Sequence, residues 1–172
     1  LVQIQDDIRS DFGWQLQHDL DSAKDLVWYC ESKSKSNPFW SKDGRLRALL
    51  ELQEMLISGP LTVLGAAAEP DDVRDAIVRG QRIIAADGAV GVLNESEYPG
   101  LAWDALLCVV SDGDGDMADL AMAAERGVPF VLHAHGDNIQ QWIKLLDVLF
   151  LHGTPLILTH QTPVELEGMC NP

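Results

Sequence analysis

The sequence has few cysteines, few basic residues and no long apolar run. Its three cysteines, Cys30, Cys108 and Cys170, form no CxxC pair, which excludes a disulfide framework and a cysteine zinc site. Its 12 lysines and arginines face 27 aspartates and glutamates, and the net charge of −15 argues against nucleic acid or an anionic membrane as partner. No apolar run is long enough to span a membrane, and no secretory leader is visible. We therefore expect a cytoplasmic protein.

Common nucleotide-binding and catalytic signatures are also absent. The chain has no Walker lysine, no G-x-G-x-x-G, no G-x-S-x-G and no kinase signature. It does have 172 residues with 47% hydrophobic content, which suits one globular domain of ordinary size. The acidic charge does not exclude ATP as a ligand, because bound divalent ions can reverse the local field.

The hydrophobic periodicity divides the chain into two parts. Residues 1–58 carry helix-like patterns interrupted by a polar stretch, and residues 59–172 alternate short apolar runs with helices. This alternation predicts a three-layer α/β fold with a mostly parallel, Rossmann-like sheet and a helical N-terminal extension, packed as one compact unit. The predicted strands cover residues 61–64, 81–86, 105–110, 128–132 and 155–158.

Residues suited to binding chemistry follow the predicted strands. Loops at the carboxyl ends of parallel strands share one crevice, so we expect these residues to meet in a single site. The candidates are Asp87 and Gly88, then Asp112, Asp114 and Asp116, then His133, His135, Asp137 and Asn138, and finally Gln161.

The three alternating aspartates predict a metal site. Asp112, Asp114 and Asp116 are separated by glycines, so their carboxylates can converge without crowding, and Mg²⁺ favours a few carboxylates with water and phosphate. The alternative is a solvated turn in which Asp116 caps the following helix. A calcium EF-hand loop is excluded, because Met117 stands where glycine is needed and Ala123 where glutamate is needed.

The segment H-A-H-G-D-N, residues 133–138, allows two interpretations. Its HxHxD pattern resembles the zinc loop of metallo-β-lactamase-like hydrolases, but Asn138 stands where that family carries a further histidine. The interpretation that we favour is polar contact to phosphate or to a heterocycle, with Asp137 helping to hold a metal.

Four motifs in this order resemble one family. They are A-A-D-G-A (85–89), V-S-D-G-D-G-D (110–116), H-A-H-G-D-N (133–138) and T-H-Q-T (159–162). Over residues 61–162 the chain resembles the archaeal 6-hydroxymethyl-7,8-dihydropterin pyrophosphokinases, which are similar in fold to thiamine pyrophosphokinases. The resemblance implies Mg²⁺-dependent transfer of diphosphate from ATP to the pterin hydroxymethyl group, with release of AMP, in methanopterin or folate-type cofactor synthesis.

The resemblance also implies roles for the candidate residues. Those expected to act in catalysis are Asp112, Asp114, Asp116 and His135. The three aspartates are expected to hold Mg²⁺, with Asp87 or Asp137 as alternatives for a further ligand. Those expected to contact the nucleotide or the pterin are Asp87, Gly88, His133, Asp137, Asn138 and Gln161. The expected partners are ATP and a small heterocyclic alcohol, and a homo-oligomer is compatible with the sequence.

Three departures from the family pattern keep alternatives open. Gly113 stands where leucine is usual, the turn Gly65–Pro70 replaces a G-x-G-P-S type turn, and a glycine-rich segment like F-T-D-G-D-R is absent from this sequence. One alternative is a diphosphokinase for thiamine or another small alcohol. The other is a non-catalytic homologue that binds a nucleotide or a metal.

Overall fold

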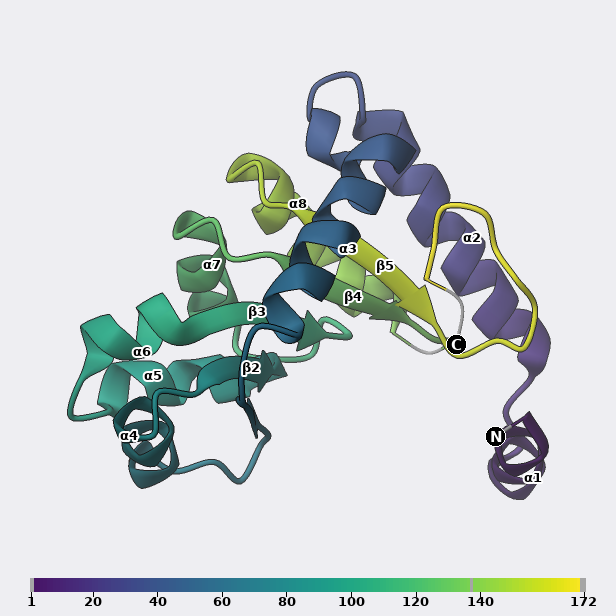
Figure 1. The fold of residues 1–172 in the computed structure, drawn as a ribbon. Helices are drawn as coiled ribbons and strands as arrows, with labels where there is room; N and C mark the ends of the chain where they lie inside the picture. Colours follow the sequence, from purple (N-terminus) through teal and green to yellow (C-terminus); the bar gives the residue numbers. More distant parts are fainter. Residues whose placement is uncertain (1, 137, 171–172) are drawn as a thin grey trace.

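A five-stranded parallel sheet organises the chain (Figure 1). The computed structural model describes residues 2–136 and 138–170. The strands lie in sequential order and each pairs in parallel with the next, which confirms the predicted Rossmann-like α/β fold. They are β1 (Leu61–Leu64), β2 (Arg82–Ala86), β3 (Leu106–Ser111), β4 (Phe130–Ala134) and β5 (Leu156–His160).

Eight α-helices occur in the described part of the chain. They are α1 (Val2–Phe12), α2 (Leu16–Lys33), α3 (Lys42–Leu56), α4 (Pro70–Val78), α5 (Val92–Glu95), α6 (Pro99–Ala105), α7 (Met117–Glu125) and α8 (Ile139–Leu151). Two short 3₁₀ helices, η1 (Pro38–Trp40) and η2 (Asp87–Gly91), complete the elements. Helix α4 begins at Pro70, with a capping box formed by Glu69 and Asp72. None of these helices is long and apolar enough to cross a membrane.

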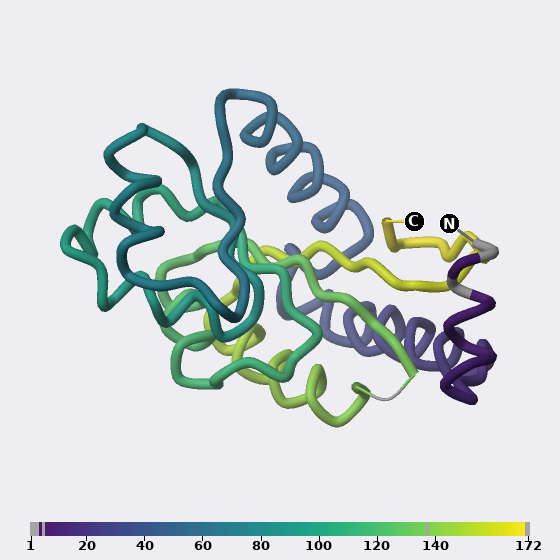
Figure 2. The backbone as a smooth tube through the Cα atoms, turned by 90° about the horizontal axis from the view of Figure 1, so that it is seen from below, coloured from purple at the N-terminus to yellow at the C-terminus, as the bar shows by residue number. Residues whose placement is uncertain are grey.

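Helices cover the two faces of the sheet unequally. Helices α4, α7 and α8 pack on one face, where the largest buried side chains include Phe130, Trp142 and Leu120. On the other face α3 alone packs against the sheet, placing Ala48 and Leu52 against β3 and β5. Figure 2 shows α3 on one side of the strands and α2 and α8 on the other. The fold therefore has three layers, of which the α3 layer is thin.

The N-terminal extension is part of the same core. Helix α2 buries Ala23, Leu26 and Cys30 beside α8, because these residues recur at helical spacing on one face. Polar groups connect the two helices as well, since Trp142 Nε1 donates to Ser22 Oγ at 3.2 Å. The compact unit expected from the sequence is thus built around one continuous core.

The ends of two strands differ from the sequence prediction. β4 and β5 both end two residues later than predicted, so His133 lies within β4, and Thr159 and His160 lie within β5. The ladder continues because His133 pairs with Thr159 and Ala134 with His160. β4 also starts later than predicted, since Pro129 has no N–H to give to a strand ladder. His133 is therefore a strand residue, whereas the sequence placed it in a loop.

Candidate functional site

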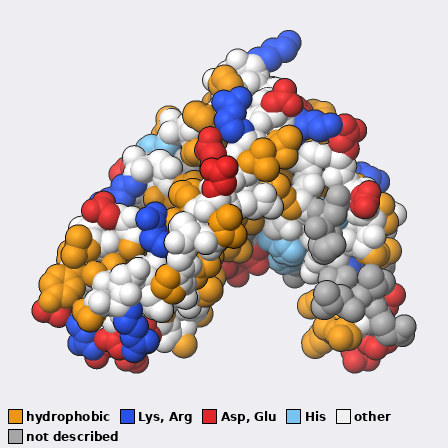
Figure 3. Space-filling view, viewed as in Figure 1, with side chains coloured by type: hydrophobic (Ala, Val, Ile, Leu, Met, Phe, Trp, Pro, Cys, Tyr) orange, Lys and Arg blue, Asp and Glu red, His pale blue; other side chains and the backbone are white. Residues whose placement is uncertain are grey.

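The candidate residues lie at the carboxyl end of the sheet, in a hollow of the surface. The sequential strand order has no reversal, so the crevice that usually forms at such a reversal is absent here. Instead, Figure 3 shows a hollow between the α4 side of the molecule and α1, with acidic and histidine side chains at its back. The N-terminal helices thus supply the second wall of the site.

Three carboxylates converge in this hollow. Oxygen atoms of Asp87, Asp112 and Asp114 all lie within 4.8 Å of one another, a spacing that a single cation can bridge. Hydrogen bonds hold the loops together, since Asp112 N donates to Asp87 Oδ1 at 3.2 Å and Asp114 N to Asp112 Oδ1 at 3.3 Å. We call these three residues the carboxylate cluster.

Glycines allow the loop after β3 to pack closely on its neighbours. Gly113 has a φ of +99°, and a Cβ added there would lie 2.6 Å from Trp142 N at the start of α8. A Cβ on Gly115 would lie 2.7 Å from Gly88 N. The leucine that the resemblance leads one to expect at position 113 does not fit this loop. Gly113 therefore fixes the cluster loop against α8.

The cluster carboxylates perturb one another. Burial, together with the charge of Asp112, raises the pKa of Asp87, whose φ of +47° is also unusual for a residue other than glycine. A hydrogen bond with Asp112 raises the pKa of Asp114, and burial adds to the shift. Burial acts to raise the pKa of Asp112 too, but hydrogen bonds with His135 and Asp114 lower it overall. A divalent cation bound among these carboxylates would favour their charged forms and oppose the raised pKa values.

Asp116 occupies a different position. Its Oδ1 accepts hydrogen bonds from Ala118 N at 2.9 Å and from Asp119 N at 3.3 Å, which makes it the N-cap of α7. The third carboxylate of the cluster is Asp87, which the sequence assigned to ligand contact and named, with Asp137, as an alternative further ligand of the metal.

Asn138 connects the loops after β3 and β4. Its side chain is buried, and Nδ2 donates to Asp112 O at 2.8 Å and to His133 O at 3.0 Å. Its Oδ1 accepts a hydrogen bond from His135 N at 3.1 Å. With both amide hydrogens engaged, Asn138 positions the loops. Asp137, the neighbouring candidate, lies outside the described residues.

The two histidines have different surroundings. His135 Nε2 lies 3.0 Å from Asp112 Oδ2, so this ring contacts the carboxylate cluster directly. His133 is half-buried in β4, and burial followed by the nearby His135 lowers its pKa. The two ring centroids are 6.1 Å apart. His135 is therefore the histidine in direct contact with the cluster.

A cavity of about 200 Å³ adjoins the cluster. We call it the acceptor cavity; it is lined by Gly13, Trp14, Gln15, His18, Asp19, His135, Gly136 and Gln161. His135 belongs to both the cavity and the cluster contacts, so it connects the two. The Trp14 ring stacks on Phe12 with centroids 5.1 Å apart, which gives one side of the cavity an aromatic surface.

Asp19 joins the N-terminal helices to the strand-end loops. Its Oδ1 accepts hydrogen bonds from Gly136 N and from Gln161 Nε2, both at 2.8 Å. Its Oδ2 accepts from Arg9 Nε at 3.1 Å, and Arg9 Nη2 donates to Gln161 O at 2.8 Å. Arg9 and Asp19 are both buried, so this network fixes α1 and α2 at the cavity.

The sequence did not predict that the N-terminal helical extension contributes residues to the cavity. Trp14 and His18 have no sequence pattern that distinguishes them from ordinary helix residues. Asp19 does have one, because it is a carboxylate on the same helical stripe as Ala23, Leu26 and Cys30. A charged residue on an apolar stripe needs a buried partner, and that signal points to a network of this kind.

Models of known protein families and curated proteins of known function give no match to this chain.

Proposed function

We propose that the protein transfers a diphosphoryl group from ATP to the hydroxymethyl oxygen of 6-hydroxymethyl-7,8-dihydropterin, with Mg²⁺ as cofactor and AMP as second product. One observation carries the proposal: the carboxylate cluster converges beside a cavity, and His135 belongs to both. A cation site and a pocket for a small molecule are what such a transfer requires side by side.

The carboxylate cluster fits a hard divalent cation. Its ligand atoms are carboxylate oxygens, which Mg²⁺ prefers, and their mutual repulsion decreases when a cation binds. Bound Mg²⁺ would neutralise charge on the transferred phosphates. Asp87, Asp112 and Asp114 would hold it, while the amide of Asn138 and the close packing of Gly113 keep the loop in place.

The acceptor cavity suits a flat heterocycle that carries an alcohol. Trp14 offers an aromatic face, and His18 and Gln161 offer polar groups at the rim. In this proposal His135 accepts the hydroxyl proton as the alcohol oxygen bonds to the β-phosphorus and the bond to the departing AMP oxygen breaks; its position at both the cluster and the cavity supports that role. Since ATP is the proposed donor, we expect the protein to act in the cytoplasm.

The direct test is to incubate the protein with ATP, Mg²⁺ and the reduced pterin alcohol and to measure AMP. AMP formed only with the pterin supports the proposal, and AMP formed only with thiamine or another alcohol changes the acceptor. Binding of Mg²⁺-ATP without any AMP would identify a non-catalytic binding protein and overturn it.

Two variants separate chemistry from general effects of charge. Asp114→Asn should abolish AMP formation, because it removes a cluster carboxylate without changing the shape of the side chain. Asp104→Asn is the matched control, since Asp104 is exposed just before the opposite, amino end of β3. Equal AMP formation by the two variants would show that the carboxylate cluster takes no part in the reaction.

A further inference from the structure

Helix α3 and its C-cap residue, Ile57, expose an apolar stripe on the face that does not contact the sheet. Leu46, Leu50 and Ile57 are 53%, 52% and 85% exposed, although α3 already buries Ala48 and Leu52 on its other side. With Gln53 included, the exposed positions 46, 50, 53 and 57 are spaced by four, three and four residues, the spacing of a coiled-coil seam. Figure 3 shows hydrophobic side chains over α3 on the side turned to the viewer.

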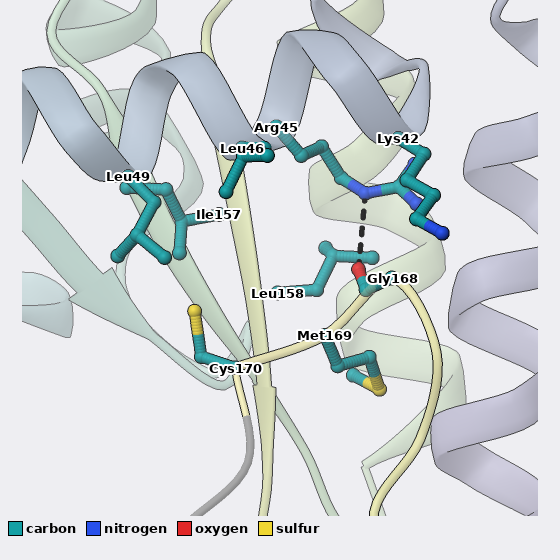
Figure 4. Close-up of a pocket in the computed structure, with 9 residues that line it drawn as sticks. All are labelled: Lys42, Arg45, Leu46, Leu49, Ile157, Leu158, Gly168, Met169 and Cys170. Atoms are coloured by element: carbon teal, nitrogen blue, oxygen red, sulfur yellow. Dashed lines mark hydrogen bonds between the residues drawn. The ribbon is translucent and has the colours of Figure 1, made fainter.

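An apolar cavity lies at one end of this stripe (Figure 4). Its volume is about 190 Å³, and its lining includes Leu46, Leu49, Ile157, Leu158 and Cys170. Hydrogen bonds and ion pairs already engage the basic groups at its rim, because Arg45 Nε donates to Gly168 O at 3.2 Å and Lys42 pairs with Glu167. The cavity therefore suits an apolar side chain rather than an anion.

The exposed charges of α3 are arranged with a direction. Lys42, Asp43 and Arg47 lie toward its start and together carry a net positive charge, whereas Glu51 and Glu54 lie toward its end. Two α3 helices packed in parallel would place like charges together, whereas antiparallel packing brings opposite charges together. The helix is thus complementary to a second copy of itself in the antiparallel orientation.

We propose that two copies of this chain form a symmetric dimer through antiparallel α3 helices. Leu46 of one copy lies opposite Ile57 of the second copy, and Ile57 enters the apolar cavity beside Leu46. The match is reciprocal by the two-fold symmetry, and the 11 positions from Leu46 to Ile57 span about 16 Å in each copy. The same alignment brings Arg47 of each copy near Glu54 of the other. This interface is separate from the carboxylate cluster and independent of the proposed reaction.

The first test is the molar mass of the full chain by light scattering after size exclusion, over a range of concentrations. The wild-type protein should have twice the 18.9 kDa of one chain. Ile57→Asp should raise the dimer dissociation constant by on the order of 100-fold or more, because both copies lose a buried isoleucine. Val78→Asp should leave it unchanged, since Val78 is 73% exposed at the end of α4 and outside this interface.

A charge exchange tests the orientation. Arg47→Glu and Glu54→Arg should each weaken the dimer, while the double variant should restore it because both opposite-charge pairs form again. A monomeric wild-type protein overturns the proposal, as does a dimer that Ile57→Asp leaves intact. A double variant no tighter than the single ones overturns the antiparallel arrangement.

Discussion

Two kinds of carboxylate lie at the same end of the sheet. Asp19 is buried and receives hydrogen bonds from Arg9, Gly136 and Gln161. Asp87 and Asp114 face other carboxylates instead, and their pKa values are raised. The two groups are connected, because Gly136 immediately follows His135, whose ring contacts the carboxylate cluster.

The difference separates a structural carboxylate from carboxylates suited to a cation. The charge of Asp19 is compensated within the protein, so this residue stabilises the fold and the cavity wall. The cluster carboxylates repel one another instead, and a bound divalent ion would compensate their negative charges. Substitutions should therefore change stability at Asp19 and ion binding in the cluster.

The largest expected effect is the loss of stability caused by Asp19→Ala. This change leaves the buried Arg9 without its main partner, and breaking such a pair costs about 3–5 kcal/mol. Asp6→Ala is the matched control, because Asp6 also pairs with Arg9 but is largely exposed, where pairs contribute about 0–1 kcal/mol. Urea denaturation measures both. Equal losses in the two variants would show that burial of the pair is unimportant.

The next effect concerns ion binding in the cluster. Asp114→Asn should weaken Mg²⁺ binding by more than about 100-fold. Loss of a residue that only positions a metal ligand already weakens binding by up to about 100-fold, and Asp114 is itself a proposed ligand. Asp116→Asn should leave the affinity nearly unchanged, because Asp116 caps α7 and asparagine caps helices equally well. Titration calorimetry with Mg²⁺ alone measures both affinities. A large loss of Mg²⁺ affinity in Asp116→Asn would show that Asp116 is also a ligand of the ion.

The smallest effect is a gain of stability in the ion-free protein on Asp87→Asn. Asparagine tolerates the positive φ of residue 87, and its Oδ1 can still accept the hydrogen bond from Asp112 N. Removing a carboxylate whose pKa is raised by burial should stabilise the protein at neutral pH by about 0.5 kcal/mol.

The same variant has a predicted pH dependence. Because the folded pKa of Asp87 is raised, the folded state holds this proton to a higher pH than the unfolded chain does. Its contribution to stability is therefore present below the ordinary value of 3.8 and is lost as the pH rises through the raised value. Asp87→Asn should lessen the loss of stability that the wild-type protein shows as the pH rises above 3.8. If the stability of Asp87→Asn changed with pH in the same way as that of the wild-type protein, this prediction would be wrong.

Local patterns in the sequence were enough to predict the fold. Short apolar runs indicate strands and the helix-period pattern indicates helices, and alternation of the two implies a parallel sheet. The strand ends were harder, because His133 and His160 continue a ladder that depends on the neighbouring strand. Polar residues near a strand end do not by themselves show where pairing stops.

The candidate site was predictable only in part, because it is assembled over long distances. The motifs placed Asp87, Asp112 and Asp114 at adjacent strand ends, where the structure brings them together. They left open whether Asp116 would bind the metal or cap the following helix, and the structure shows the cap. They also did not reveal Asp19, whose partners Gly136 and Gln161 lie more than one hundred residues further along the chain.

The Arg9 and Asp19 network has a consequence for the order of folding. The parallel sheet pairs strands that are neighbours in sequence, so it can grow progressively during synthesis. Arg9 and Gln161, by contrast, are 152 residues apart, and Asp19 and Gln161 are 142 apart. These contacts must wait until nearly the whole described chain has been made, and contacts of such separation form slowly. The cavity wall is thus the last part to assemble, which makes α1 the region most open to proteolysis in a folding intermediate.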